Sequence, residues 1–200
     1  TTGYKEDTIL VLNSGTIDLL SEDELRYVAG HECGHIKSGH VIYHTMGELF
    51  NSAISQIPVV SSFTTPIYYA LMYWIRMSEF TADRAGLLAC QDIDAAISGI
   101  IKMSGLPIKY FENMNKDAFI KQATEFKQSF SGFTDKAIKT LTIAGSTHPW
   151  TVLRAAELLT WYESGEYQDI LNANTSSECS ACHMQIPAGV KKCPYCGNEV

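Results

Sequence analysis

The stretch S-E-D-E-L-R-Y-V-A-G-H-E-C-G-H, residues 21–35, decides the fold more than any other part of this 200-residue chain. It opens with a capping box. In this motif the Ser21 side chain accepts a hydrogen bond from a backbone N–H of the first turn, and the Glu24 carboxylate accepts one from the backbone N–H of Ser21. The box predicts that a helix begins at about Glu22, and we expect it to continue through His44. This helix would carry the H-E-C-G-H motif in its middle.

The motif His31-Glu32-Cys33-Gly34-His35 places two imidazoles one helical turn apart. Residues four apart lie about 40° apart on the helical wheel, so His31 and His35 face one point. This spacing suits a zinc ion, whose nitrogen ligands lie about 2.0–2.1 Å from the metal. Glu32 borders the same face, where its carboxylate can take a proton from an activated water. We therefore predict a catalytic zinc with Glu32 as the general base.

A catalytic zinc needs a third protein ligand and an open fourth position. The metzincin pattern would supply a third histidine at residue 41, but the chain has Val41 there. The better candidate is Glu79, which a second helix would place on one face with Asp83. We expect Glu79 to bind zinc and Asp83 to accept a hydrogen bond from a ligand histidine. A pair of surface carboxylates is the alternative interpretation.

Two later residues, His148 and Arg154, also have chemistry that fits such a site. A histidine far from the motif can stabilise the oxyanion that forms when a carbonyl is attacked. An arginine can bind a substrate carbonyl or hold a carboxylate near the metal. The residues alone leave these roles open beside the interpretation that both are ordinary surface residues. His40 and His44 continue the expected helix and could line the cleft, but we interpret both as structural.

The end of the chain has a separate metal-binding pattern. Its four cysteines form two C-x-x-C pairs, Cys179 with Cys182 and Cys193 with Cys196. Such pairs are typical of a structural zinc held by four thiolates, and they suit a reducing compartment. So small a unit has almost no core, and the metal must supply its folding energy. We predict a zinc ribbon at 178–200, and thus one catalytic and one structural zinc per chain.

Composition and charge limit the kind of partner. The net charge of −7 is spread along the chain without a basic patch, which argues against a nucleic-acid partner. We divide the chain into a catalytic domain at 1–165, a polar linker at 166–177 and the ribbon. The chain begins without a methionine, so we expect the native polypeptide to continue upstream of this domain.

Residues 49–75 contain no charged side chain, and the run I-Y-Y-A-L-M-Y-W-I at 67–75 is rich in aromatic residues. Aromatic side chains of this kind collect at membrane interfaces. Pro58 and Pro66 argue against a single membrane span. Two interpretations remain open, a buried helix hairpin beside the active site and contact with a membrane, through this segment or through one that precedes Thr1.

The remaining pattern predicts a mostly helical domain with a small sheet. Residues 8–12 are β-branched and apolar and precede a turn signal at 13–15, which indicates a strand. Helical periodicity, caps and breakers predict five further helices. Their expected limits are about 66–90, 92–104, 109–128, 134–144 and 150–164.

Three segments, at 12–40, 78–86 and 146–158, resemble metallopeptidase family 48, which includes HtpX and the zinc-type CAAX prenyl protease. They carry H-E-C-G-H, S-E-F-T-A-D-R-A-G and S-T-H-P-W-T-V-L-R-A-A-E-L, and the likeness covers roughly residues 8–160. The resemblance implies a gluzincin fold, and it implies a role for each matching residue. His31, His35 and Glu79 would bind zinc, Glu32 would act as base, Asp83 would orient a ligand, and His148 and Arg154 would contact the substrate or the transition state.

We therefore expect an α+β, mostly helical, zincin-like metallopeptidase domain followed by a four-cysteine ribbon. Its activity would be zinc-dependent endopeptidase cleavage of proteins or peptides, in the cytoplasm or at the cytoplasmic face of a membrane. In such folds a strand near the active helix pairs with an extended substrate, and Ile9–Leu12 is the candidate. The alternative is a latent or non-catalytic zinc scaffold that docks protein partners. Glu32 argues against it, because a structural zinc needs no base.

Overall fold

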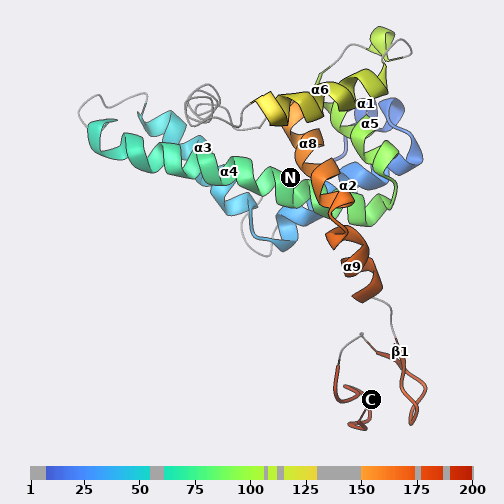
Figure 1. Ribbon diagram of the computed structural model, residues 1–200. Helices are drawn as coiled ribbons and strands as arrows, with labels where there is room; N and C mark the ends of the chain where they lie inside the picture. The colour runs from blue at the N-terminus through green and yellow to red at the C-terminus, as the bar shows by residue number, and fades with distance from the viewer. Residues whose placement is uncertain are drawn as a thin grey trace. The chain divides into compact units, whose positions relative to one another are not determined.

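The computed structural model describes residues 8–54, 61–105, 108–111, 115–129, 150–173, 177–186 and 190–199. The described residues are mostly helical, as the sequence predicted (Figure 1). They divide into two compact units, Thr1–Leu159 and Thr160–Val200. The elements are α1 (Ser14–Leu19), α2 (Glu22–Lys37), α3 (Val41–Ile54), α4 (Ser61–Cys90), α5 (Ile93–Met103), η1 (Ile108–Tyr110), α6 (Lys116–Ser129), α8 (Thr151–Glu163), α9 (Glu166–Ala173), β1 (Ser177–Glu178) and β2 (Gln185–Ile186).

The start of α2 is the capping box that the sequence predicted. The backbone N–H of Glu24 donates to Ser21 Oγ at 3.3 Å, and the backbone N–H of Ser21 donates to Glu24 Oε2 at 2.7 Å. The Glu24 side chain is also buried against α5, where Lys102 Nζ donates to its Oε2 at 2.6 Å and Ser98 Oγ to its Oε1 at 2.5 Å. One carboxylate therefore caps α2 and anchors it to α5.

Helix α2 ends at Lys37 rather than continuing to His44, which corrects the predicted limit. The chain turns at Gly39, whose φ of +68° lies in the left-handed region that favours glycine. Two hydrogen bonds close the turn: Gly39 N–H to the carbonyl of Ile36 at 3.1 Å, and His40 N–H to the carbonyl of His35 at 2.9 Å. This Schellman motif ends α2, and α3 starts in a new direction.

Helices α2 and α4 pack against each other through glycine and alanine. A Cβ added at Gly30 would lie 2.4 Å from Ala89 Cβ, and one added at Gly34 would lie 2.7 Å from Ala85 Cβ. Neither position has room for a side chain, so the two helix axes can approach closely. This contact brings the motif histidines of α2 opposite the carboxylates of α4.

Several predicted limits differ from the structure. Residues 8–12 form no continuous strand, and Val11 is 71% exposed. The expected turn is instead the cap of α1, because the Asn13 side chain accepts from Thr16 N–H at 2.8 Å. Helix α4 begins five residues before Pro66, and α6 begins at Lys116 rather than 109. The helix expected at 134–144 lies outside the described residues.

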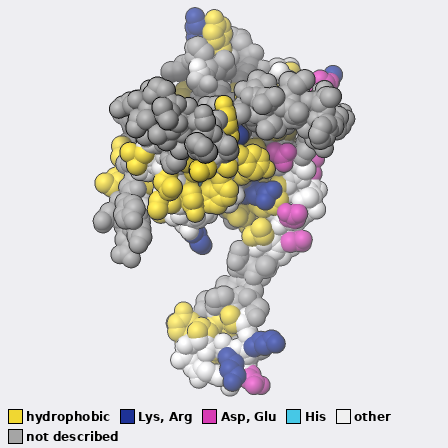
Figure 2. Space-filling view, turned by 90° about the vertical axis from the view of Figure 1, so that its left-hand side faces the viewer, with side chains coloured by type: hydrophobic (Ala, Val, Ile, Leu, Met, Phe, Trp, Pro, Cys, Tyr) yellow, Lys and Arg dark blue, Asp and Glu magenta, His cyan; other side chains and the backbone are white. Residues whose placement is uncertain are grey.

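Helix α4 has one buried and one exposed face along the aromatic run at 67–75. Met72 and Ile75 are buried, whereas Tyr69, Tyr73 and Trp74 are exposed. Seen from the side on which α3 and α4 lie in Figure 1, the surface carries a group of hydrophobic side chains (Figure 2). Across the described part of the chain, no helix combines the length and the apolarity that crossing a membrane requires.

Candidate metal centres

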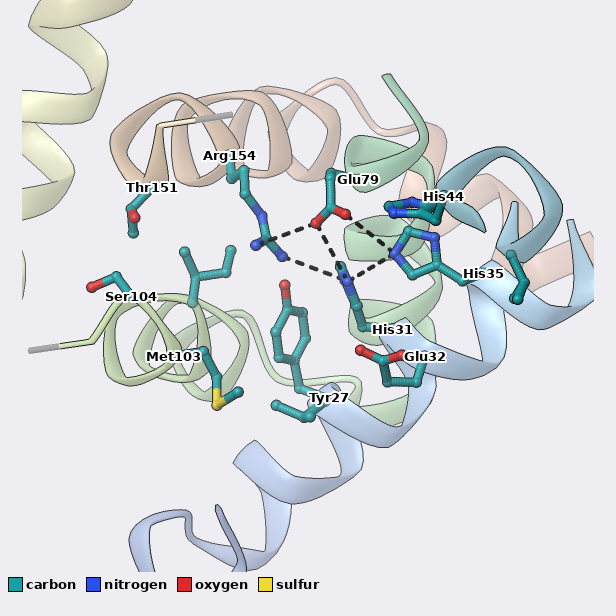
Figure 3. A pocket seen from close by; sticks show the side chains of 13 residues that line it. Tyr27, His31, Glu32, His35, His44, Glu79, Met103, Ser104, Thr151 and Arg154 are labelled. Carbon is teal, nitrogen blue, oxygen red and sulfur yellow. Dashed lines mark hydrogen bonds and ion pairs between the residues drawn. The ribbon is translucent and has the colours of Figure 1, made fainter. Parts of the chain in front are cut away.

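Three side chains from two helices converge at one end of a cavity in the first unit. His31 and His35 lie one turn apart on α2, and Glu79 faces them from α4 (Figure 3). The two Nε2 atoms are 3.1 Å apart. Glu79 Oε2 is 3.6 Å from His31 Nε2, and Glu79 Oε1 is 3.5 Å from His35 Nε2. All three residues are buried.

These separations fit a tetrahedral metal ion. Ligand atoms about 2.0–2.1 Å from a zinc ion at tetrahedral angles lie about 3.3 Å from one another. The three measured distances bracket that value. The donor set also suits a cation, because two imidazole lone pairs and a carboxylate that converge at this range are stabilised by a positive charge between them. His31, His35 and Glu79 therefore have the chemistry and the spacing of a zinc site.

Behind His31, the side chain of Asp83 is surrounded by donors. His31 Nδ1 lies 2.9 Å from Asp83 Oδ1, and Tyr27 Oη donates to the same oxygen at 2.6 Å. Arg154 donates from Nη2 to Oδ1 at 2.5 Å and from Nε to Oδ2 at 2.9 Å. The contact with Asp83 holds the proton of His31 on Nδ1, which leaves the Nε2 lone pair for a metal.

The surroundings of Asp83 and His35 shift the pKa of each side chain and so set its protonation state. Burial alone would raise the pKa of Asp83, but hydrogen bonds from Arg154 and His31 outweigh it and hold that pKa well below its ordinary value. Burial, together with His31, lowers the pKa of His35 from 6.5 to about 3. Asp83 is therefore charged and His35 neutral at physiological pH, as a metal site with a hydrogen-bonded ligand demands.

The structure places Arg154 on the two carboxylates. Besides its bonds to Asp83, its Nη1 lies 3.5 Å from Glu79 Oε2, and its side chain is 17% exposed. Arg154 thus joins α8 to α4 beside the metal ligands (Figure 3). The other candidate from this part of the sequence, His148, lies outside the described residues.

The cavity that the site opens into has a volume of about 550 Å³. Glu32 lines it next to the candidate metal ligands, and Figure 3 shows its side chain beside His31. Residues from α2, α3, α5 and α8 form the rest of the wall, among them Val28, Ile100 and Met103. A peptide entering this cavity would meet the metal ligands and Glu32 together.

The comparison with protein families agrees with this geometry. The model of peptidase family M48 matches residues 1–162, which include every residue of the His–His–Glu site and its surroundings. The chain belongs to peptidase family M48. The resemblance seen in the sequence is therefore confirmed, and the family supports a protease function for the chain.

The chain is also similar to two curated proteins whose names describe peptidases. The chain is 31% identical over 170 residues to the "Plastoglobule-localized metallopeptidase 48, chloroplastic" of Arabidopsis thaliana, a match that covers 84% of this chain and 49% of the relative. It is 28% identical over 108 residues to a "Protease HtpX homolog" of Bordetella petrii, covering 50% of this chain and 34% of that one. The chain thus spans half or less of the length of these relatives. No solved structure matches.

The second candidate metal site lies beyond the M48 match, in the four-cysteine cluster. Cys179 Sγ lies 3.7 Å from Cys196 Sγ, and Cys182 Sγ lies 3.6 Å from Cys193 Sγ. Four thiolates at about 2.3 Å from a tetrahedral zinc would lie about 3.8 Å apart. The antiparallel strands β1 and β2 hold the first pair of cysteines in a hairpin. The cluster confirms the four-cysteine unit that the sequence predicted.

The pKa values of the four-cysteine cluster differ from one thiol to the next. Backbone N–H groups of Cys182 and Ala181 lower the pKa of Cys179 to about 6. The backbone N–H of Met184 favours the Cys182 thiolate, yet burial and the neighbouring sulfurs outweigh it and raise the pKa of Cys182 to about 12. One thiolate forms readily and the next is opposed, and a metal ion bound by the four sulfurs would favour the thiolate form of each.

Sequence reasoning missed Tyr27 at the M48 site, and it gave His40 and His44 a structural role although both could line the cleft. Tyr27 lies one turn before His31, so the four-residue spacing could have shown that it shares the face of the metal ligands. His44 lines the cavity, and His40 is buried beside His35, with 3.2 Å between their Nδ1 atoms. What the sequence did not indicate is the contact between His40 and His35, which depends on the turn at Gly39.

Proposed function

We propose that this chain is a zincin-like, zinc-dependent metalloendopeptidase that cleaves protein or peptide substrates. The observation that carries the proposal is the convergence of His31, His35 and Glu79, at the spacing of a tetrahedral zinc, on a cavity that Glu32 also lines. Membership of peptidase family M48 supports hydrolysis of a peptide bond.

A zinc ion held there would polarise the carbonyl of the scissile peptide bond and lower the pKa of water. Glu32 accepts the proton of the attacking water and transfers it to the nitrogen of the leaving amine. Its position follows from the helix, because residue 32 is adjacent to ligand His31 and borders the same face. The reaction therefore needs Glu32 as a base and then as an acid.

Side chains that contact His31 and Glu79 on the side away from the metal hold these two ligands in position. Asp83 fixes the tautomer and the ring plane of His31, and Tyr27 and Arg154 hold Asp83 in place. Arg154 also draws Glu79 toward the site by ion pairing. We assign His148 to contact with the substrate or the transition state, as the resemblance to M48 implies.

We propose further that residues 1–165 form the catalytic domain and 178–200 a zinc ribbon, connected by 166–177. Helix α9 lies within this connection. Because a four-thiolate site is stable where thiols stay reduced, we place the protein in the cytoplasm or at the cytoplasmic face of a membrane.

The experiment that tests the function compares Glu32→Gln with the parent protein in hydrolysis of casein and of a peptide library. The amide keeps the shape of the side chain but cannot accept the proton, so we expect kcat to fall by about 100-fold or more. Zinc content should remain the same. Glu163→Gln, which changes an exposed residue of α8, is the matched control and should retain the parent rate. Equal rates for Glu32→Gln and the parent would instead favour the latent or non-catalytic scaffold.

A further inference from the structure

The turn between α2 and α3 brings a third histidine to the metal site. His40 follows Gly39, and its backbone N–H donates to the carbonyl of His35 at 2.9 Å. This bond ties the backbone of His40 to the last turn of α2. The Nδ1 atoms of His40 and His35 are 3.2 Å apart, within hydrogen-bond distance.

The ring of His40 is held in this position by its surroundings. The residue is 7% exposed, and its ring meets Trp74 of α4 edge to face, with 6.1 Å between the ring centroids and 87° between the planes. Its ring centroid lies 5.2 Å from that of His35, with the planes at 72°. His40 is therefore fixed on two sides, by the α2 turn and by α4.

The hydrogen bond between the two rings has a defined direction once the metal site is considered. His35 presents Nε2 to His31 and Glu79, so a metal takes the lone pair of that nitrogen. A neutral imidazole bound through Nε2 carries its proton on Nδ1. His35 Nδ1–H must then donate, and His40 Nδ1 must accept, which places the proton of His40 on Nε2.

We propose that His40 is a positioning residue for the metal site: it accepts the hydrogen bond of His35 Nδ1–H and holds the His35 ring with Nε2 toward the ion. This inference rests on the proposed function. It gives each ligand histidine its own acceptor, Asp83 for His31 and His40 for His35. Such partners fix ring orientation and contribute substantially to metal affinity.

The acceptor for His31 is a carboxylate, whereas the acceptor for His35 is a neutral imidazole, and this difference has a physical reason. Glu79 and Asp83 already place two negative charges in a buried site that has Arg154 as its guanidinium partner. A third carboxylate behind His35 would need further compensation and would weaken the ability of the ion to withdraw electrons from a substrate carbonyl. A neutral imidazole orients His35 without adding charge.

The test uses two variants of the full chain that separate the hydrogen bond from the packing. In His40→Asn, the Oδ1 atom takes the place of Nδ1 and keeps the acceptor, while the contact with the Trp74 ring is lost. In His40→Leu, an apolar side chain keeps the bulk against Trp74 but cannot accept a hydrogen bond. Zinc affinity is measured by competition with a chromophoric chelator, and Glu79→Ala identifies which binding step belongs to the His–His–Glu site. Binding at the four cysteines serves as an internal control.

We expect His40→Leu to weaken zinc binding at the His–His–Glu site by about 10-fold or more, and His40→Asn to remain within about threefold of the parent. Parent-like binding by His40→Leu would overturn the inference. An equal loss in both variants would also overturn it, because packing rather than the hydrogen bond would then be responsible. If His40→Leu does not fold, the result for His40→Asn decides, since loss of affinity in a variant that keeps the acceptor contradicts the proposal.

The same measurement separates this inference from the proposed function. If the parent shows no zinc-binding step that Glu79→Ala removes, the catalytic zinc site is wrong, and the role of His40 is wrong with it. If the parent shows that step and His40→Leu leaves it unchanged, only the role of His40 is wrong. Neither outcome depends on peptidase activity.

Discussion

Arg154 and Asp83 lie 71 residues apart in the sequence, and their side chains form a two-point contact in which the guanidinium meets both carboxylate oxygens. The Asp83 side chain is 1% exposed, and that of Arg154 is 17% exposed. The pair joins α8 to α4 directly behind His31, so the first turn of α8 helps to set the geometry of the proposed zinc ligands. Asp83 accepts from His31, Tyr27 and Arg154 together.

Removal of the arginine should therefore destabilise the fold and weaken the zinc site. In Arg154→Met, the Asp83 carboxylate stays buried without its main partner, and we expect a loss of about 3 kcal/mol in the free energy of unfolding. Urea denaturation of the chelator-treated protein measures it. The double variant Asp83→Asn/Arg154→Met removes both charges and should recover part of this loss. A loss under about 1 kcal/mol in the single variant would show that the pair contributes little.

Glu79 should account for one of two zinc ions per chain. We expect elemental analysis to find about two in the parent and about one in Glu79→Ala, because two histidines alone make a weak site. Cys193→Ser is the complementary variant, which should lose the ribbon zinc and keep the zinc bound by Glu79. Unchanged zinc content and affinity in Glu79→Ala would mean that another residue is the third ligand.

Close contact between α2 and α4 makes Gly30 a sensitive position. Alanine has the better helix propensity by about 1 kcal/mol, yet its Cβ at residue 30 would lie 2.4 Å from Ala89 Cβ. We expect Gly30→Ala to destabilise the protein by about 1–3 kcal/mol in urea denaturation, because the helices must separate. Gly30→Ala/Ala89→Gly moves the methyl group to the other helix and should restore most of the stability. Stabilisation by the single variant would contradict this packing.

Glu24 should make the stability of the fold depend on pH. Burial alone would raise its pKa, but hydrogen bonds from Lys102, Ser98 and the backbone N–H of Ser21 outweigh it and hold the pKa below the ordinary value of 4.5. Because the folded pKa is the lower one, its stabilisation is complete above pH 4.5 and is lost as the pH falls through the folded value.

The variant Glu24→Gln tests this dependence by chemical denaturation at a series of pH values. At pH 7 we expect a loss of about 1–3 kcal/mol, since a buried, charge-assisted hydrogen bond to Lys102 is broken. The difference between parent and variant should shrink as the pH falls below 4.5. A difference that stays constant over the acid range would show that Glu24 acts through its shape and not through its charge.

The features that could be predicted from the sequence depend on residues that are close together along the chain. The capping box at Ser21 and Glu24 formed as predicted, because both partners lie within one helical turn. The four-residue spacing placed His31 and His35 on one face of α2 for the same reason. The two C-x-x-C pairs predicted the four-cysteine cluster, since each pair needs only a tight turn and a shared ion. In each case the two partners are three or four residues apart, so local backbone geometry is enough to bring their side chains together.

Tertiary structure decided which distant groups meet. Asp83 reaches His31 across 52 residues, and Arg154 reaches Asp83 across 71, through the packing of α2, α4 and α8. That packing needs the space left by Gly30 and Gly34, which periodicity does not reveal. The end of α2 at Lys37 is local by contrast, because hydrogen bonds between neighbouring residues close the turn at Gly39, and a glycine after a basic last turn is a signal that the predicted limit overlooked. Local patterns thus set where a helix stops, but only the packing of the folded chain selects which distant side chains lie together.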